Sequence, residues 1–215
     1  SNVNGKPVML PVESYGIKLL SIGFFAPGSQ AVVWRGPMAT KALNQLIKDA
    51  YWGKLDYLLI DLPPGTGDIH LSLVQAVPVT GAVIVSTPQT IALADAKKGV
   101  GMFQMDTIQV PVLGLVENMA YFSPDELPDH KYYIFGKDGT KNLAGDLNLP
   151  LLGEIPLVQT IREAADIGHP VTLQSGSPSA EAFMDLASNM VSQLELRNQQ
   201  KKPSEVVNIT NTVSY

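Results

Sequence analysis

The sequence contains no cysteine among its 215 residues. This absence excludes disulfide bonds, thiol catalysis, zinc sites built on thiolates and iron–sulfur clusters held by cysteines of this stretch. Charged residues are also scarce, at 16%, with 15 Lys and Arg against 20 Asp and Glu. The resulting net charge of −5 provides no broad basic surface, so we expect neither nucleic acid nor an anionic membrane among the partners.

Long apolar runs are missing as well. A membrane-spanning helix requires roughly 20 apolar residues in succession, and no run approaches that length. We therefore expect a cytoplasmic protein. Hydrophobic residues still make up 45% of the chain, which excludes a disordered polypeptide and is enough for a sizeable core.

Short apolar runs alternate with longer helical patterns, which is typical of an α/β fold with a doubly wound, mostly parallel sheet. Several runs are apolar at consecutive positions, as in strands that helices cover on both faces. The expected strands span residues 17–24, 57–61, 81–87, 110–116 and 151–155. The expected helices span residues 37–51, 68–77, 90–105, 140–147, 158–167 and 179–197.

The last of these helices is the best specified, because Ser177 can cap its start and Pro178 suits its first turn. Lys201, Lys202 and Pro203 then break the pattern. We therefore expect one domain over residues 1–197 and a polar tail over 198–215, which lacks the apolar face of a membrane-binding helix.

The strongest local signal is an apolar run that ends at Asp61 and enters a loop rich in proline and glycine. A carboxylate at the carboxyl end of a strand stands where open α/β sheets bind ligands, and it is suited to Mg²⁺ beside a nucleotide. Gly65 and Gly67 would let backbone N–H groups approach a terminal phosphate, and Asp68 can cap the next helix. The alternative is a rigid turn after an ordinary strand, but the density of proline and glycine favours a shaped, functional loop.

Several segments together resemble one family. They are SIGF (21–24), VWRGPM (33–38), DLPPGTGD (61–68), TPQ (87–89), GLVENM (114–119), IFG (134–136) and GEIPL (153–157). In this order they resemble the Mrp/ApbC iron–sulfur cluster carriers, which are MinD-like, deviant P-loop ATPases. The resemblance extends to about the final helix. The chemistry of the Trp34–Arg35 pair in the second segment cannot be derived from the sequence.

The resemblance implies a homodimeric, ATP-dependent iron–sulfur cluster carrier that acts on apo-proteins, with ATP and Mg²⁺ as cofactors. Asp61 matches the family's Walker B aspartate, which holds Mg²⁺ through water, and Gly65 and Gly67 belong to its switch II loop; these three are the expected catalytic residues. Asn118, Pro156 and Leu157 match the positions that contact adenine. The alternatives are an Asx turn at Asn118 and, for the other two, a proline-terminated strand joined to a helix.

The sequence departs from the family in lacking the P-loop. Its nearest look-alike, residues 135–139, has no Ser or Thr after the lysine and no upstream glycine at the required spacing. We therefore expect a C-terminal fragment of a MinD-like domain without its P-loop unit, and a natural relative without a P-loop is the alternative. Because the P-loop lysines provide most of the charge stabilisation, this chain should not hydrolyse ATP alone.

The family's CxxC pair is also missing, since Ser123, Pro124, Asp125 and Glu126 follow the aromatic pair at 121–122. Asp125, Glu126, Asp129 and His130 could bind a harder metal, although such a group is more often a solvated loop. A non-enzymatic scaffold that has lost cluster carriage is therefore a second hypothesis. A MinD- or ParA-like positioning ATPase is disfavoured by the polar tail and the acidic charge.

The missing cysteines predict that this chain holds no iron–sulfur cluster. Anaerobic reconstitution with iron and sulfide should leave it colourless, because oxygen ligands match the iron of a sulfide-bridged cluster poorly. The measurement is the charge-transfer absorption of the protein after gel filtration. A stoichiometric brown chromophore that stays with the chain would contradict the prediction and would point to Asp125, Asp129 and His130 as ligands.

Overall fold

The computed structural model describes residues 2–3, 6–25, 36–124, 127 and 130–208. Trp34, Arg35, Asp125, Glu126 and Asp129 lie outside the described residues. The chain divides into two compact units: unit 1 comprises Ser1–Pro78 and Val206–Thr210, and unit 2 comprises Val79–Glu205 and Asn211–Tyr215.

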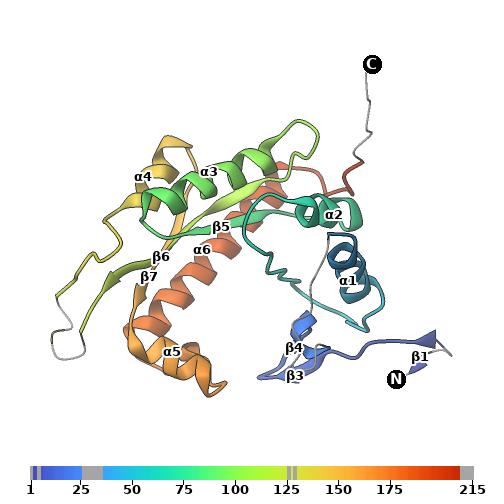
Figure 1. Ribbon diagram of the computed structural model, residues 1–215, viewed down its shortest axis with the longest axis horizontal. Helices are drawn as coiled ribbons and strands as arrows, with labels where there is room; N and C mark the ends of the chain where they lie inside the picture. Colours follow the sequence, from blue (N-terminus) through green and yellow to red (C-terminus); the bar gives the residue numbers. More distant parts are fainter. Residues whose placement is uncertain (1, 4–5, 26–35, 125–126, 128–129, 209–215) are drawn as a thin grey trace. The chain divides into compact units, whose positions relative to one another are not determined.

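Unit 2 is built on a parallel sheet with the strand order β5-β6-β7. Its strands are β5 (Ala82–Ser86), β6 (Val112–Phe122) and β7 (Leu151–Leu157). Its helices are α3 (Thr90–Gln104), α4 (Gly139–Asp146), α5 (Gln159–Asp166), the 3₁₀ turn η2 (Val171–Leu173) and α6 (Pro178–Gln200). Figure 1 shows α3 and α4 on one face of this sheet and α6 on the other.

The core of unit 2 occupies both faces of the sheet. Leu115 of β6 is completely buried and packs with Val100 of α3 and Ala144 of α4. Its neighbour Val116 points to the opposite face, because successive side chains of a strand alternate. There it packs with Leu152 and Ile155, and Phe183 and Leu186 of α6 cover them. These contacts explain the consecutive apolar residues of β6 and confirm the parallel α/β class.

The described part of unit 1 contains short strands and two α-helices. The strands are β1 (Asn2–Val3), β2 (Lys6–Pro7), β3 (Val12–Ser14) and β4 (Ile17–Leu19); they are followed by the 3₁₀ turn η1 (Ile22–Phe24), α1 (Gly36–Lys48) and α2 (Asp68–Ala76). β3 and β4 form an antiparallel hairpin whose two turn residues, Tyr15 and Gly16, both have positive φ. Such a turn matches the natural twist of paired strands. Thr40 Oγ1 of α1 and Ser72 Oγ of α2 lie 3.0 Å apart.

Two expected strands are wrong in whole or in part. In the run at 17–24, the strand ends at Leu19 and pairs antiparallel with β3. The Ser21 side chain then accepts a hydrogen bond from the Gly23 N–H at 3.1 Å and caps the start of η1. The run at 57–61 forms no strand, because no neighbour pairs with it among the described residues. Leu59 remains 78% exposed there. A short apolar run needs the hydrogen bonds of an adjacent strand, which periodicity alone cannot guarantee.

The six expected helices are all confirmed, and their ends are shifted by no more than a few residues. The expected cap of α2 is wrong: Gly67 is the N-cap, and Asp68 is already helical. α2 ends where it does because a residue before proline avoids the helical region, and Val77 before Pro78 is extended. β6 and β7 run further than expected, to Phe122 and Leu157. The division of the chain at residue 197 stays a prediction.

The cap of α6 provides a test of local helix chemistry. The Ser177 hydroxyl accepts a hydrogen bond from the Ala180 N–H at 3.1 Å, and Pro178 begins the helix. Ser177→Ala should lower the free energy of unfolding by about 1 kcal/mol, because an orphan N–H loses its partner. Ser192→Ala is the control, since this exposed hydroxyl bonds within the helix, to the Ser188 carbonyl. Equal urea midpoints for the two variants would contradict the assigned cap.

Candidate functional site

The candidate residues are divided between the two units. Asp61, Gly65 and Gly67 belong to unit 1, whereas Asn118, Pro156 and Leu157 belong to unit 2. Each unit therefore carries its own part of the predicted site.

In unit 1, the loop of residues 61–67 is open to solvent. Asp61, Gly65 and Gly67 are exposed, and an added Cβ at either glycine would meet nothing within 4 Å. Gly65 has a φ of +96°, which a side chain would strain, whereas Gly67 has an ordinary φ of −82°. An exposed carboxylate and free space beside the positive end of α2 can receive a hydrated cation and an anion.

His70 fixes this loop to α2. Its N–H donates to the Gly67 carbonyl at 3.1 Å, and its ring Nδ1 lies 3.3 Å from the same oxygen. The His70 side chain is buried, so it acts as part of the local structure.

In unit 2, the parallel ladder brings Asn118 to the other candidate residues. Asn118 pairs with Ile155 at the last regular step between β6 and β7, so Pro156 and Leu157 follow directly along the neighbouring strand. Pro156 is buried and lies within β7, one residue beyond the end of the strand expected from the sequence. Proline is tolerated there because β7 is an edge strand of the described sheet.

The Asn118 side chain is already used locally. Its Oδ1 accepts a hydrogen bond from the Met119 N–H at 3.0 Å, and Met119 has a φ of +54° where the ladder shifts its register. The bond reaches the next residue and not the second one along, so it is not the Asx turn given as the alternative to base binding. It does not engage the side-chain amide nitrogen, so Asn118 can still donate a hydrogen bond to an acceptor.

Glu117 is the residue that the sequence analysis missed. Its side chain is only 1% exposed, and its Oε2 accepts a hydrogen bond from the Thr140 N–H of α4 at 2.5 Å. Burial raises the pKa of Glu117 above its ordinary value of 4.5. The backbone N–H groups of Thr140 and Lys141 oppose this shift, and the nearby Glu154 carboxylate adds to it. The available signal was a single acidic residue directly after the apolar run 112–116.

This carboxylate also explains the look-alike at residues 135–139. A Cβ at Gly139 would lie 2.4 Å from the Pro88 carbonyl oxygen, so this glycine permits close packing of α4 against the end of β5. Thr140 Oγ1 points to the Thr87 carbonyl at 3.5 Å. Because Glu117 occupies N–H groups at the start of α4, a phosphate there would meet a carboxylate. The geometry of this loop therefore serves packing.

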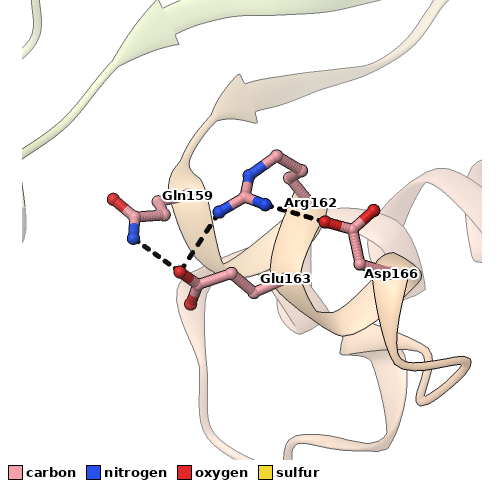
Figure 2. A network of polar contacts seen from close by, with 4 residues as sticks. All are labelled: Gln159, Arg162, Glu163 and Asp166. Carbon is pink, nitrogen blue, oxygen red and sulfur yellow. Dashed lines mark hydrogen bonds and ion pairs between the residues drawn. The ribbon is translucent and has the colours of Figure 1, made fainter.

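α5 follows β7 and carries a surface network, shown in Figure 2. Arg162 Nη1 donates to Asp166 at 2.7 Å and Nη2 to Glu163 at 3.3 Å, and Gln159 donates to the same Glu163 oxygen at 2.5 Å. All four side chains are exposed or half-exposed, so we assign the network only a small stabilising effect. The guanidinium of Arg162 is engaged by carboxylates and is not presented as a free phosphate ligand.

The part of the chain that the structure describes contains no group of three or more His, Asp and Glu side chains placed to hold a metal ion. His130, which the sequence offered as a ligand, is exposed, and its carbonyl accepts a hydrogen bond from Ser123 Oγ at 3.1 Å. Within the same described residues, no helix is long and apolar enough to cross a membrane.

The buried carboxylate gives a testable pH dependence. Because the pKa of Glu117 is raised by folding, the folded state binds its proton more tightly than the unfolded chain does. Its contribution to stability should be complete below pH 4.5 and should be lost as the pH rises through the raised pKa. Glu117→Gln should remove this dependence, as measured by urea unfolding over a pH series. The exposed Glu195→Gln is the control and should leave the profile unchanged; an unchanged profile in Glu117→Gln would refute the assignment.

Comparison with known proteins identifies close relatives of the chain. It is 45% identical over 203 residues to the iron–sulfur cluster transfer protein NUBPL of Dictyostelium discoideum, which covers 94% of this chain and 62% of that protein. The chain thus spans less than two thirds of the length of that relative.

Solved structures agree with the fold. A nucleotide-binding protein from Archaeoglobus fulgidus, solved in complex with ADP, matches with a TM-score of 0.64 and 34% identity over 80% of this chain and 65% of that one. The cell-division ATPase MinD of Pyrococcus furiosus matches with a TM-score of 0.51 and 25% identity over 75% of this chain and 63% of that one. The fold is therefore the MinD-like α/β fold expected from the sequence.

The family model described as ParA, NUBPL iron-transfer P-loop NTPase, matches residues 1–191. Together with the 45% identity to NUBPL over most of the chain, this match shows that the chain belongs to the NUBPL iron-transfer family of P-loop NTPases.

Proposed function

We propose that the protein to which this chain belongs is an ATP-dependent carrier that delivers iron–sulfur clusters during iron–sulfur protein assembly. The observation that carries the proposal is the 45% identity, over 94% of the chain, to an iron–sulfur cluster transfer protein. The site residues fit this function, because one unit offers an exposed carboxylate and an open glycine loop and the other offers a polar amide beside apolar residues.

Asp61 is the proposed magnesium residue. Mg²⁺ retains several waters and is usually held by one or two carboxylates together with substrate phosphates, so a single exposed carboxylate fits this ion. Bound Mg²⁺ would neutralise phosphate charge. Gly65 and Gly67 would bring backbone N–H groups to the terminal phosphate without a side chain in the way.

Asn118, Pro156 and Leu157 are proposed to hold the adenine base. The Asn118 amide nitrogen can donate to a ring nitrogen, since its oxygen is held by the Met119 N–H. Pro156 is buried and Leu157 half-buried; both are apolar residues of the strand next to Asn118, and as successive residues they point to opposite faces of β7. This division of polar and apolar contacts is usual for ligand pockets.

The cluster is the cargo, and this stretch contributes no thiolate to it. We infer that the thiolates are supplied by residues outside these 215 or by a partner. The proposed assembly is a homodimer, and the proposed clients are iron–sulfur apo-proteins. The cytoplasmic location and the absence of nucleic-acid and membrane partners stay predictions. A scaffold that binds proteins without using ATP remains the second candidate, because it too would need no cysteine here.

A test in cells separates the two candidates. Asp61→Asn is introduced into the gene in its native host, and the activities of iron–sulfur enzymes are measured against an enzyme that has no cluster. We expect the iron–sulfur activities to fall about tenfold or more, because a neutral amide is a poor ligand for Mg²⁺, while the reference enzyme is unchanged.

Asp56→Asn is the matched control, because Asp56 is an exposed aspartate of the same irregular segment. It should leave all activities near the wild-type level. Normal iron–sulfur activities in Asp61→Asn, with the protein present at its usual abundance, would favour the scaffold over the ATP-dependent carrier.

A further inference from the structure

The C-terminal segment returns to unit 1 and contacts α2. Residues Val206–Thr210 belong to unit 1, although the chain before them belongs to unit 2. The Val207 N–H donates a hydrogen bond to the Val74 carbonyl in the last turn of α2 at 2.9 Å. The sequence had indicated only a polar tail for this segment.

This hydrogen bond replaces one that α2 cannot make for itself. In a continuing helix the carbonyl of Val74 would accept from the N–H of residue 78, but residue 78 is proline and has no N–H. The neighbouring carbonyl of Leu73 is satisfied by the Val77 N–H at 3.0 Å. The Val74 carbonyl would otherwise be an orphan, and Val74 is only 1% exposed, so water is a poor substitute.

α2 depends on such contacts because it is short. It has nine residues, and an isolated helix of that length is marginal in water. Thr40 of α1 contacts Ser72 on the same helix, and Val207 contacts its last turn. The start of α2 is joined directly to the candidate loop, where the His70 N–H holds the Gly67 carbonyl.

We propose that Val207 is a positioning residue for the loop of residues 65–67, and that it acts by pinning the end of α2 through its backbone N–H. The link between that loop and phosphate sensing rests on the proposed function; the pinning of α2 does not. The segment is suited to reversible attachment, because Val206 and Asn208 on either side of Val207 are exposed. A partner that captured residues 206–208 would free α2.

The test uses the whole 215-residue chain without nucleotide, so it does not depend on whether the protein is an ATPase. Val207→Pro removes the N–H, whereas Val207→Ala keeps it and removes most of the side chain. Hydrogen exchange of α2 should become about tenfold faster or more in Val207→Pro and should change little in Val207→Ala. Exchange of β6 in unit 2 is the internal control and should be unchanged in both variants.

The cysteine-free sequence allows a second measurement on the loop itself. Thr66→Cys creates a unique attachment point for a spin label at an exposed position of the loop. The label should gain mobility when Val207→Pro is added and should not when Val207→Ala is added. This readout separates a positioning role from a general loss of stability.

A chain ended at Gln200 provides a third arm, in case proline disturbs the segment in other ways. It should show the fast exchange of α2, and a synthetic peptide of residues 201–215 should restore slow exchange, whereas the same peptide with proline at 207 should not. Three results would overturn the proposal: α2 exchange within twofold of wild type in Val207→Pro, equal effects of the two Val207 variants, or no change in label mobility.

Discussion

In unit 2, the junction of β6 and α4 depends on the hydrogen bond that the Glu117 carboxylate accepts from the Thr140 N–H at the start of α4. α4 has no cap of its own, because Asp138 before it is left-handed and its side chain makes no capping bond. The strand supplies the missing acceptor instead. With α4 held in this way, Gly139 packs on Pro88 at the end of β5, and Asn118 follows Glu117 on β6. One buried carboxylate thus joins β6 to the start of α4.

The same carboxylate gives different chemistry to two helix starts that look alike in sequence. Both helices begin next to two glycines, Gly65 and Gly67 before α2 and Gly136 and Gly139 at α4, and the positive end of either helix would attract an anion. At α4 the anion is the Glu117 carboxylate of the protein itself. Pro88 occupies the space beside Gly139, where an added Cβ would lie. At α2 the loop is exposed and an added Cβ would meet nothing. The start of α2 is therefore the better candidate for an external phosphate.

The sequence predicted the elements of unit 2 well because each carries its own local signal, such as the apolar run of β6 and the Ser177 cap of α6. It failed at residues 57–61 because a strand requires a neighbour, and the described chain provides none. It proposed Asp61, Gly65 and Gly67 from the loop after an apolar run, and Asn118, Pro156 and Leu157 from the family resemblance. The last three lie on adjacent strands of unit 2. The roles of Glu117 and Val207 were not predicted, because their partners, Thr140 and Val74, are distant in sequence and no local pattern connects them.

Because this stretch of an iron-transfer protein has no cysteine, the groups needed for nucleotide recognition can be considered apart from those needed for cluster binding. Nucleotide recognition needs carboxylate, amide and backbone N–H groups, and those are hard donors and acceptors that this chain possesses. Cluster binding needs soft thiolates, and the sequence has none, while thioethers of its seven methionines are weak ligands by comparison. The two functions therefore place no shared demand on these residues. If the carrier proposal holds, the cargo is bound outside this stretch, and what these residues contribute is the control of binding and release by nucleotide.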